Sequence, residues 1–129
     1  MTNAIVRTSL HSYSETVAKL AAAITHGGGT LFANIDQSAA AQSVGLTLRP
    51  TTLLVFGNPR GGTPLMDAFP LVALDLPLKL LIWEEPGAVK VAYTPPAELA
   101  ERYGVTGKDQ VISSMEHQVE ALVGSVSSA

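Results

Sequence analysis

Residues 45–64 read GLTLRPTTLLVFGNPRGGTP, and this stretch decides the fold. Its middle, Thr51 to Phe56, is a continuous run of strand length, which predicts a buried central strand of a sheet. Both ends are polar and rich in proline, glycine and threonine, and each carries one arginine, Arg49 or Arg60. A strand of about six residues at roughly 3.3 Å each separates these ends by about 20 Å. We therefore expect Arg49 and Arg60 to belong to different sites, unless a second subunit brings them together.

Outward from this strand, the sequence predicts short strands and a few helices in one domain over residues 1–129. The Ser12–Glu15 capping box opens a helix that ends at the glycines 27–29. Residues 59–64 are predicted as a loop and 124–129 as a frayed tail. The other predicted helices cover residues 38–42, 96–102 and about 107–123, and the predicted strands cover 4–8, 30–35, 51–56, 78–83 and 89–93.

The spacing of these elements indicates the fold class. The strands follow one another too closely for a helix between each pair, which disfavours a doubly wound α/β fold. We expect an α+β fold, with an antiparallel-rich twisted sheet and two main helices on one face.

The composition indicates a compact domain with apolar surface to spare. Hydrophobic residues make up 47% of the 129-residue chain and charged residues only 15%, which argues against disorder. A surplus of apolar surface in a small domain is most often covered by a second copy, so we expect a homodimer. The formal charge of −3 gives no basic patch for nucleic acid.

The charges are unevenly spread along the chain. Residues 1–60 hold four basic and two acidic side chains, a net of +2, and residues 61–129 hold four basic and nine acidic ones, a net of −5. This difference fits an acidic, solvated C-terminal helix, or an acceptor for a small anion in the first half.

The chain contains no cysteine, which excludes disulfides, thiolate nucleophiles, thiolate zinc sites and iron–sulfur clusters. The apolar runs stop well short of the roughly 18 residues that a membrane-spanning helix needs. We expect no secretory signal, no membrane partner and a cytoplasmic location.

The segment from Gly57 to Thr63 is the first candidate for a ligand site. Its glycines could bring backbone N–H groups close to an anion, and Arg60 would add charge. It matches neither a P-loop nor a dinucleotide fingerprint. The alternative is a tight structural turn in which Asn58 bonds its own backbone.

Four charged residues are further candidates, each with a structural alternative. Arg49 could bind a carboxylate ligand, or could pair with Asp36 or Asp75. Asp36 could instead cap the short helix that follows it. Lys79 could act as a base if it is buried, or could lie at the wet end of its strand and pair with Asp75.

Catalytic and metal-binding motifs are not recognisable in the sequence. None of the histidines, His11, His26 and His117, has metal-ligand spacing to another. No serine lies in a Gly-x-Ser-x-Gly turn. We therefore expect no metal site and name no cofactor.

Several blocks of the sequence, taken in order, carry a family resemblance. They are residues 35–36, 45–50, 51–59, 62–66 and 74–79, then Trp83 with its acidic neighbours, Tyr93 just ahead of Pro95, and Leu99 to Tyr103. Over about residues 4–105 the chain resembles the bacterial and archaeal domain-of-unknown-function family 302. The resemblance implies a compact α+β fold similar to that of the TATA-box-binding protein, and a dimeric tendency. It implies no activity, and a shared fold is no argument for DNA binding.

One position departs from the family pattern. The family usually has Asp-His at the end of the second strand, where this chain has Asp36 and Gln37. A histidine there could bind a metal or haem, or move a proton, and glutamine can do none of these. Any such role is therefore in doubt for this chain.

Three hypotheses about function follow. The first is a non-catalytic module, either binding a small anionic or amphipathic ligand or acting as a dimeric regulatory accessory. The second is an enzyme acting on a small anionic molecule, with Asp36 or Asp75 as acid and base. The third is a structural protein–protein interaction module. Convergence of at least three candidate side chains in one pocket would support a site, and the candidates are Asp36, Arg49, Asn58, Arg60, Thr63, Asp75 and Lys79.

Overall fold

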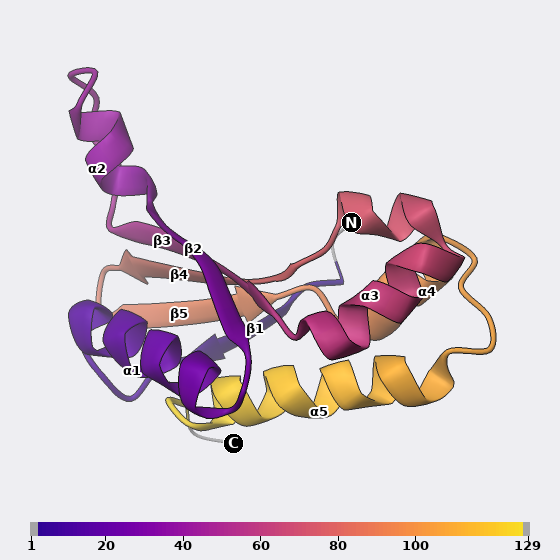
Figure 1. Ribbon diagram of the computed structural model, residues 1–129. Coiled ribbons are helices and arrows are strands. Elements are labelled where there is room, and N and C mark those ends of the chain that lie inside the picture. The colour runs from indigo at the N-terminus through magenta and orange to yellow at the C-terminus, as the bar shows by residue number, and fades with distance from the viewer. Residues whose placement is uncertain (1–2, 128–129) are drawn as a thin grey trace.

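The computed structural model describes residues 3–127 and shows an α+β fold built on one antiparallel sheet (Figure 1). The order of the five strands across the sheet is β1-β5-β4-β3-β2. The strands are β1 (Ile5–Thr8), β2 (Thr30–Asp36), β3 (Thr51–Gly57), β4 (Leu78–Glu85) and β5 (Ala88–Tyr93). The helices are α1 (Tyr13–His26), α2 (Gln37–Gln42), α3 (Pro59–Ala68), the 3-10 helix η1 (Pro70–Leu74), α4 (Pro96–Arg102) and α5 (Asp109–Gly124).

Strand β3 lies inside the sheet, as the sequence predicts, because it pairs with β2 on one side and with β4 on the other. Only one of its faces is fully buried. Thr52, Leu54 and Phe56 point into the core, whereas Leu53 and Val55 are only partly covered. A continuous apolar run predicts burial on both faces, and the structure corrects that expectation. We call the partly covered side the open sheet face.

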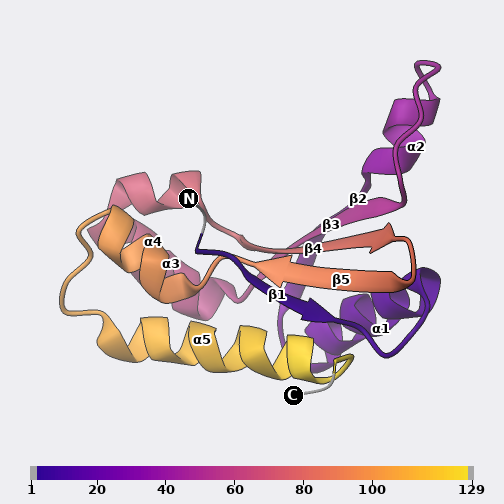
Figure 2. The same cartoon turned by 180° about the vertical axis from the view of Figure 1, so that it is seen from behind.

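The opposite side of the sheet is covered by α1 and α5 (Figures 1 and 2). The capping box of α1 is present, since the Ser12 hydroxyl accepts from the Glu15 backbone N–H at 3.2 Å and donates to the Glu15 carboxylate at 3.1 Å. Leu20 and Ile24 of α1 are buried in the same core as Val119 of α5. The prediction of two main helices on one face is therefore confirmed.

The end of the chain is more ordered than the sequence predicts. Val126 is only 1% exposed, and Ser127 forms an isolated β-bridge with Ser9. The backbone N–H of Leu10 also donates to the Val126 carbonyl at 2.8 Å. The frayed tail is thus wrong for residues 125–127, because one apolar side chain anchors them. The rest of the predicted tail, 128–129, lies outside the described residues.

Between β2 and β3 the chain leaves the body of the molecule. Residues 37–50, including α2, project from the side of the sheet that α1 and α5 do not cover (Figures 1 and 2). The Asp36 carboxylate caps α2 by accepting from the Ala39 backbone N–H at 2.9 Å. No residue of α2 is buried. We call residues 37–50 the arm.

None of the helices formed by residues 3–127 is both long enough and apolar enough to cross a membrane.

Candidate ligand-binding site

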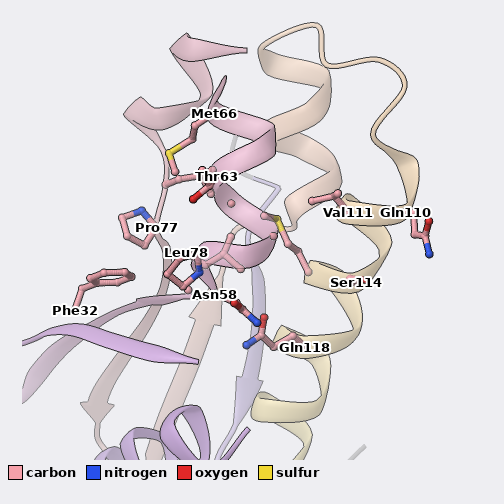
Figure 3. A pocket seen from close by; sticks show the side chains of 16 residues that line it. Phe32, Asn58, Thr63, Met66, Pro77, Leu78, Gln110, Val111, Ser114 and Gln118 are labelled. Atoms are coloured by element: carbon pink, nitrogen blue, oxygen red, sulfur yellow. The ribbon is translucent and has the colours of Figure 1, made fainter. Parts of the chain in front are cut away.

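A cleft of about 400 Å³ opens where β3 leads into α3, and the part of α5 from Gln110 to Gln118 forms its other wall (Figure 3). Its apolar side chains include Phe32, Met66 and Met115, and its polar groups are amides and hydroxyls. None of the described residues that line it is charged. They are Phe32, Gly57, Asn58, Pro59, Gly61, Gly62, Thr63, Met66, Leu76, Pro77, Leu78, Gln110, Val111, Ser114, Met115 and Gln118.

The first wall of the cleft is a helix where the sequence predicts a loop. Asn58 is the N-cap of α3, and its side-chain oxygen accepts from the Arg60 backbone N–H at 3.0 Å. Pro59 occupies the first helical turn, where its missing N–H costs nothing. The prediction of a loop over 59–64 is wrong, because the Asn58 cap starts a helix whose first turn accommodates Pro59.

This helix also removes the predicted anion cradle. The N–H of Arg60 is used by the Asn58 side chain, and those of Gly61 and Gly62 both donate to the Asn58 carbonyl at 3.0 Å. The Arg60 side chain is not part of the cleft wall. The segment therefore offers neutral groups to the cleft and no free set of N–H donors for an anion.

Two glycines in this helix face the cleft without a packing reason. Glycine inside a helix costs roughly 0.5–1 kcal/mol relative to alanine. A Cβ added at Gly61 would meet nothing within 4 Å, and one at Gly62 would meet only Met66 Cε at 3.7 Å. Both residues line the cleft. What their missing side chains provide is open space in the cleft.

A β-bulge in β2 brings Phe32 to the cleft. Leu31 pairs with Phe56 and Ala33 pairs with Val55, so Phe32 is the extra residue on its strand. A bulge redirects a side chain and is common beside functional sites. Figure 3 shows Phe32 beside Pro77 at one end of the cleft. The sequence contains no signal for this bulge, and Phe32 was not among the candidates.

The second wall is one face of α5. Gln110, Ser114 and Gln118 recur every four residues, so they form a polar stripe along the helix next to Val111 and Met115. In Figure 3 the Gln118 side chain points toward Asn58, and that of Gln110 points away from the cleft. This uncharged stripe could have been found from the sequence, because the spacing of its members is regular.

Of the seven predicted site residues, only Asn58 and Thr63 line this cleft. Asp75 and Lys79 line a separate hollow of about 300 Å³ on the open sheet face. Arg49 lines a third, shallow hollow at the β4–β5 turn. Arg60 and Asp36 line none of these three. None of these three hollows, as the described residues form them, is lined by three of the predicted residues.

Asp75 is bonded by Arg102, the last residue of α4, and by Tyr103, which follows that helix. Its carboxylate accepts from Arg102 Nη1 at 2.7 Å and from the Tyr103 hydroxyl. These hydrogen bonds, with that of Tyr103 the largest contribution, lower the pKa of Asp75 below its usual value. Lys79 Nζ donates to the Pro77 carbonyl at 3.1 Å. The partner of Asp75 in the structure is thus Arg102, in place of the predicted Arg49 or Lys79.

Asp36 caps α2, which is the structural alternative to a ligand-binding role for this residue. Besides capping α2, its carboxylate accepts from the Ser38 hydroxyl at 2.6 Å, and this bond is the main cause of a lowered pKa of Asp36. Among residues 3–127, no group of three His, Asp or Glu side chains could hold a metal ion.

Comparisons with known proteins agree on the fold and the family. The family described as "Domain of unknown function DUF302" matches residues 5–122. A crystal structure of an uncharacterized conserved DUF302 protein from Bacillus stearothermophilus superposes with a TM-score of 0.83 at 20% sequence identity, covering 92% of this chain and 94% of that one.

Two curated relatives carry a functional name. They are the proteins called "Fluoride-specific ion channel FluC 1" in Brucella suis biovar 1 (strain 1330) and in Brucella abortus biovar 1 (strain 9-941), each 39% identical over 109 residues. The matches cover 83% of this chain but only 43% and 40% of those relatives, so the chain spans about two fifths of their length. The match over residues 5–122 confirms the resemblance seen in the sequence, and the chain belongs to the DUF302 family.

Proposed function

We propose that this chain is a non-catalytic module that binds a small, uncharged and mainly apolar ligand in the cleft between α3 and α5. The observation that carries the proposal is the lining of the cleft, which is apolar with a few neutral hydrogen-bonding groups and contains no charged residue among those described. Small-molecule sites typically have this composition and occupy roughly 300–1,000 Å³. We also propose that this chain, which contains no cysteine, is cytoplasmic.

The polar groups suggest how such a ligand would be oriented. Asn58 and Gln118 come from opposite walls, and an amide offers both a donor and an acceptor. The hydroxyls of Thr63 and Ser114 can likewise each donate and accept a hydrogen bond. A ligand with an apolar body and a carbonyl, amide or hydroxyl group would satisfy both parts of the lining. An anion would lose its hydration without gaining a charged partner, which is unfavourable.

The enzyme hypothesis has less support. Asp36 and Asp75, its proposed acid and base, lie outside the cleft. Both carboxylates are engaged in structural hydrogen bonds that lower the pKa, and a lowered pKa makes a carboxylate a weaker base at neutral pH.

The cleft can be blocked from a single helix position. Ser114 lies on the cleft side of α5, and its neighbour Ser113 is also exposed but does not line the cleft. We expect neutral amphipathic compounds to raise the melting temperature of the wild-type chain and of Ser113→Phe, but not of Ser114→Phe. If charged compounds alone stabilise the protein, or if both phenylalanine variants respond like wild type, the proposed site is wrong.

We further propose that the module acts as an accessory domain in fluoride transport. The support is the 39% identity to part of two proteins named fluoride-specific ion channels, more than half of whose length lies outside the match. The matched segment would modulate a transport unit carried by the remainder.

This second proposal can be tested on the Brucella suis relative. The relative and a version without the matched segment are reconstituted in vesicles, and fluoride efflux is measured with an electrode, with and without this chain added in trans. We expect removal of the segment to change the efflux rate and addition of the chain to restore it in part. Identical rates in all samples would contradict an accessory role.

A further inference from the structure

One end of the cleft between α3 and α5 is built from ring faces and bare backbone. Phe32, the extra residue of the bulge in β2, is 53% exposed. A Cβ added at Gly57 would meet Pro77 Cβ at 3.5 Å and Phe32 Cε2 at 3.8 Å, so both rings lie against a residue that has no side chain. Figure 3 shows the two rings together at this end of the cleft. An exposed phenylalanine face beside open space is a surface on which another ring can stack.

The adjoining part of the wall also lacks branched side chains. Gly61 and Gly62 of α3 contribute open space, and the methionine side chain of Met66 lies next to them, 3.7 Å from the place of a Cβ on Gly62. A second methionine, Met115, lines the cleft from α5. Methionine is unbranched, and its sulfur makes favourable contacts with aromatic rings, often at the ring edge. These surfaces favour a flat ring over a branched aliphatic body.

Two side-chain amides lie next to the ring end, because Asn58 directly follows Gly57. Asn58 Oδ1 accepts from the Arg60 backbone N–H at 3.0 Å, so its Nδ2 group remains as a donor. Gln118 comes from the opposite wall, and its side chain points toward Asn58 (Figure 3). Within residues 3–127 the Gln118 amide forms no hydrogen bond. Such an amide binds an edge that presents a donor beside an acceptor, as asparagine and glutamine do with adenine.

We propose that the ligand of this cleft is a neutral, planar heteroaromatic compound with a lactam edge, that is, a ring N–H beside a ring carbonyl. The ring would stack on Phe32, and the lactam edge would exchange two hydrogen bonds with the Gln118 amide, while Asn58 Nδ2 donates to the same carbonyl. This inference rests on the proposed function, because it specifies the ligand of the same site. The described lining has no charged residue, which disfavours rings that carry a phosphate or a carboxylate.

A flexible aliphatic ligand accounts for less of the lining. Its body would cover the apolar wall but would gain no stacking energy from the exposed face of Phe32. A lone hydroxyl or ketone would use one group of the Gln118 amide and leave the other without a partner once water is displaced, which is costly. A planar lactam uses the ring face and both groups of the amide.

Three compounds separate the contribution of the ring from that of the lactam edge. Carbostyril is a planar bicyclic lactam, N-methylcarbostyril lacks the N–H donor, and decahydroquinolinone keeps the lactam but is not planar. We expect isothermal titration to give the lowest dissociation constant for carbostyril, with each of the other two weaker by roughly three- to tenfold. If all three bind equally, the planar-lactam inference is wrong and the proposed function stands. If no neutral compound of any shape binds, both are wrong.

Variants assign each preference to a residue. Phe32→Leu should reduce the preference for carbostyril over decahydroquinolinone, and Phe32→Tyr, which keeps the ring, should retain it. Gln118→Leu should remove the preference for carbostyril over N-methylcarbostyril. Gln42→Leu is the matched control, because Gln42 is an exposed glutamine of α2 that does not line the cleft.

Each variant is judged by a ratio of two affinities, so a general loss of stability does not imitate the expected result. Far-ultraviolet circular dichroism checks that the variants fold. If the ratios in Phe32→Leu and Gln118→Leu equal those of the wild type, these residues do not select the ligand and the inference is overturned.

Discussion

The two ends of β3 look alike in the sequence but lead to different surfaces. Each end has proline, glycine, threonine and one arginine. The end before Thr51 joins an exposed arm whose helix α2 has no buried residue. The end after Gly57 enters α3, which buries Leu65 in the core and forms one wall of the cleft. What distinguishes the two ends is therefore the packing of the neighbouring helix, which is exposed for α2 and partly buried for α3.

The comparison also changes the role of the arginines. Arg49 and Arg60 drew attention because a charge beside glycine and proline is typical of an anion site. Neither points into the cleft. The cleft at one end and residues 37–48 of the arm at the other both consist of neutral and apolar groups. Each region can be tested by changes that should affect one end of β3 and not the other.

The largest difference should appear in the free energy of unfolding. Phe56, at the cleft end of β3, is 0% exposed, and its replacement by alanine should lower the stability by about 3–5 kcal/mol. Leu46→Ala on the arm should change it by no more than about 0.5 kcal/mol. Urea unfolding at low protein concentration, where association contributes least, measures both. A comparable loss for Leu46→Ala would mean that the arm is part of the folded core.

The caps of the two helices provide the next comparison. Asn58→Ala removes the N-cap of α3 and should cost about 1 kcal/mol of global stability, because α3 is packed against the core. Asp36→Ala removes the equivalent cap of α2. We expect that loss to appear only as faster amide hydrogen exchange in residues 37–42, since α2 can open without exposing core residues.

Equal changes in the urea midpoint of the two cap variants would contradict this assignment. The conservative variants Asn58→Asp and Asp36→Asn keep an oxygen acceptor at the cap and serve as controls.

Much of the fold follows from local patterns in the sequence. Ser12 and Glu15 mark the start of α1, and the repeat of Val111, Met115 and Val119 marks the inner side of α5, because these signals depend on residues close in the chain. The start of α3 was missed because Pro59 and the glycines suggested a turn. The anchoring of the chain end at Val126 involves Ser9 and Leu10, which follow β1 and lie more than a hundred residues earlier in the sequence, and no local pattern records it.

The candidate site was harder to predict for the same reason. Its lining comes from four separate parts of the chain, namely β2, the start of α3, the residues before β4, and α5. Six of the lining residues lie within residues 45–64, but only Asn58 and Thr63 of them were predicted as site residues. Charged residues beside turns indicate an anion site, whereas a neutral cleft carries no such signal. The bulge at Phe32 arises from how β2 pairs with β3, which the sequence of β2 alone does not show.

The glycines of α3 should show a trade between stability and binding. Gly61→Ala adds a methyl group where nothing lies within 4 Å, so it should raise the free energy of unfolding by roughly 0.5–1 kcal/mol. The same methyl group should weaken any ligand that occupies the cleft. Gly45→Ala on the arm is the contrasting change, because Gly45 has φ of +80°, where an alanine is strained. If Gly61→Ala binds ligands as wild type does, the cleft wall has been assigned wrongly.

The smallest effect concerns pH. Asp75 immediately precedes Leu76 and Pro77 of the cleft wall, and its bonds to Tyr103 and Arg102 lower its pKa. Because the unfolded chain has the higher pKa, about 3.9, the bonds contribute stability above that pH and lose it as the pH falls through the folded-state value. Asp75→Asn should therefore be less stable than wild type at pH 7, with a gap that narrows below about pH 4. Arg102 is largely solvated, and solvated ion pairs contribute little, so this gap should be smaller than that of Asn58→Ala. If the stability difference between wild type and Asp75→Asn stayed constant through the acid range, the charge of the Asp75 carboxylate would not stabilise the cleft wall at Leu76 and Pro77.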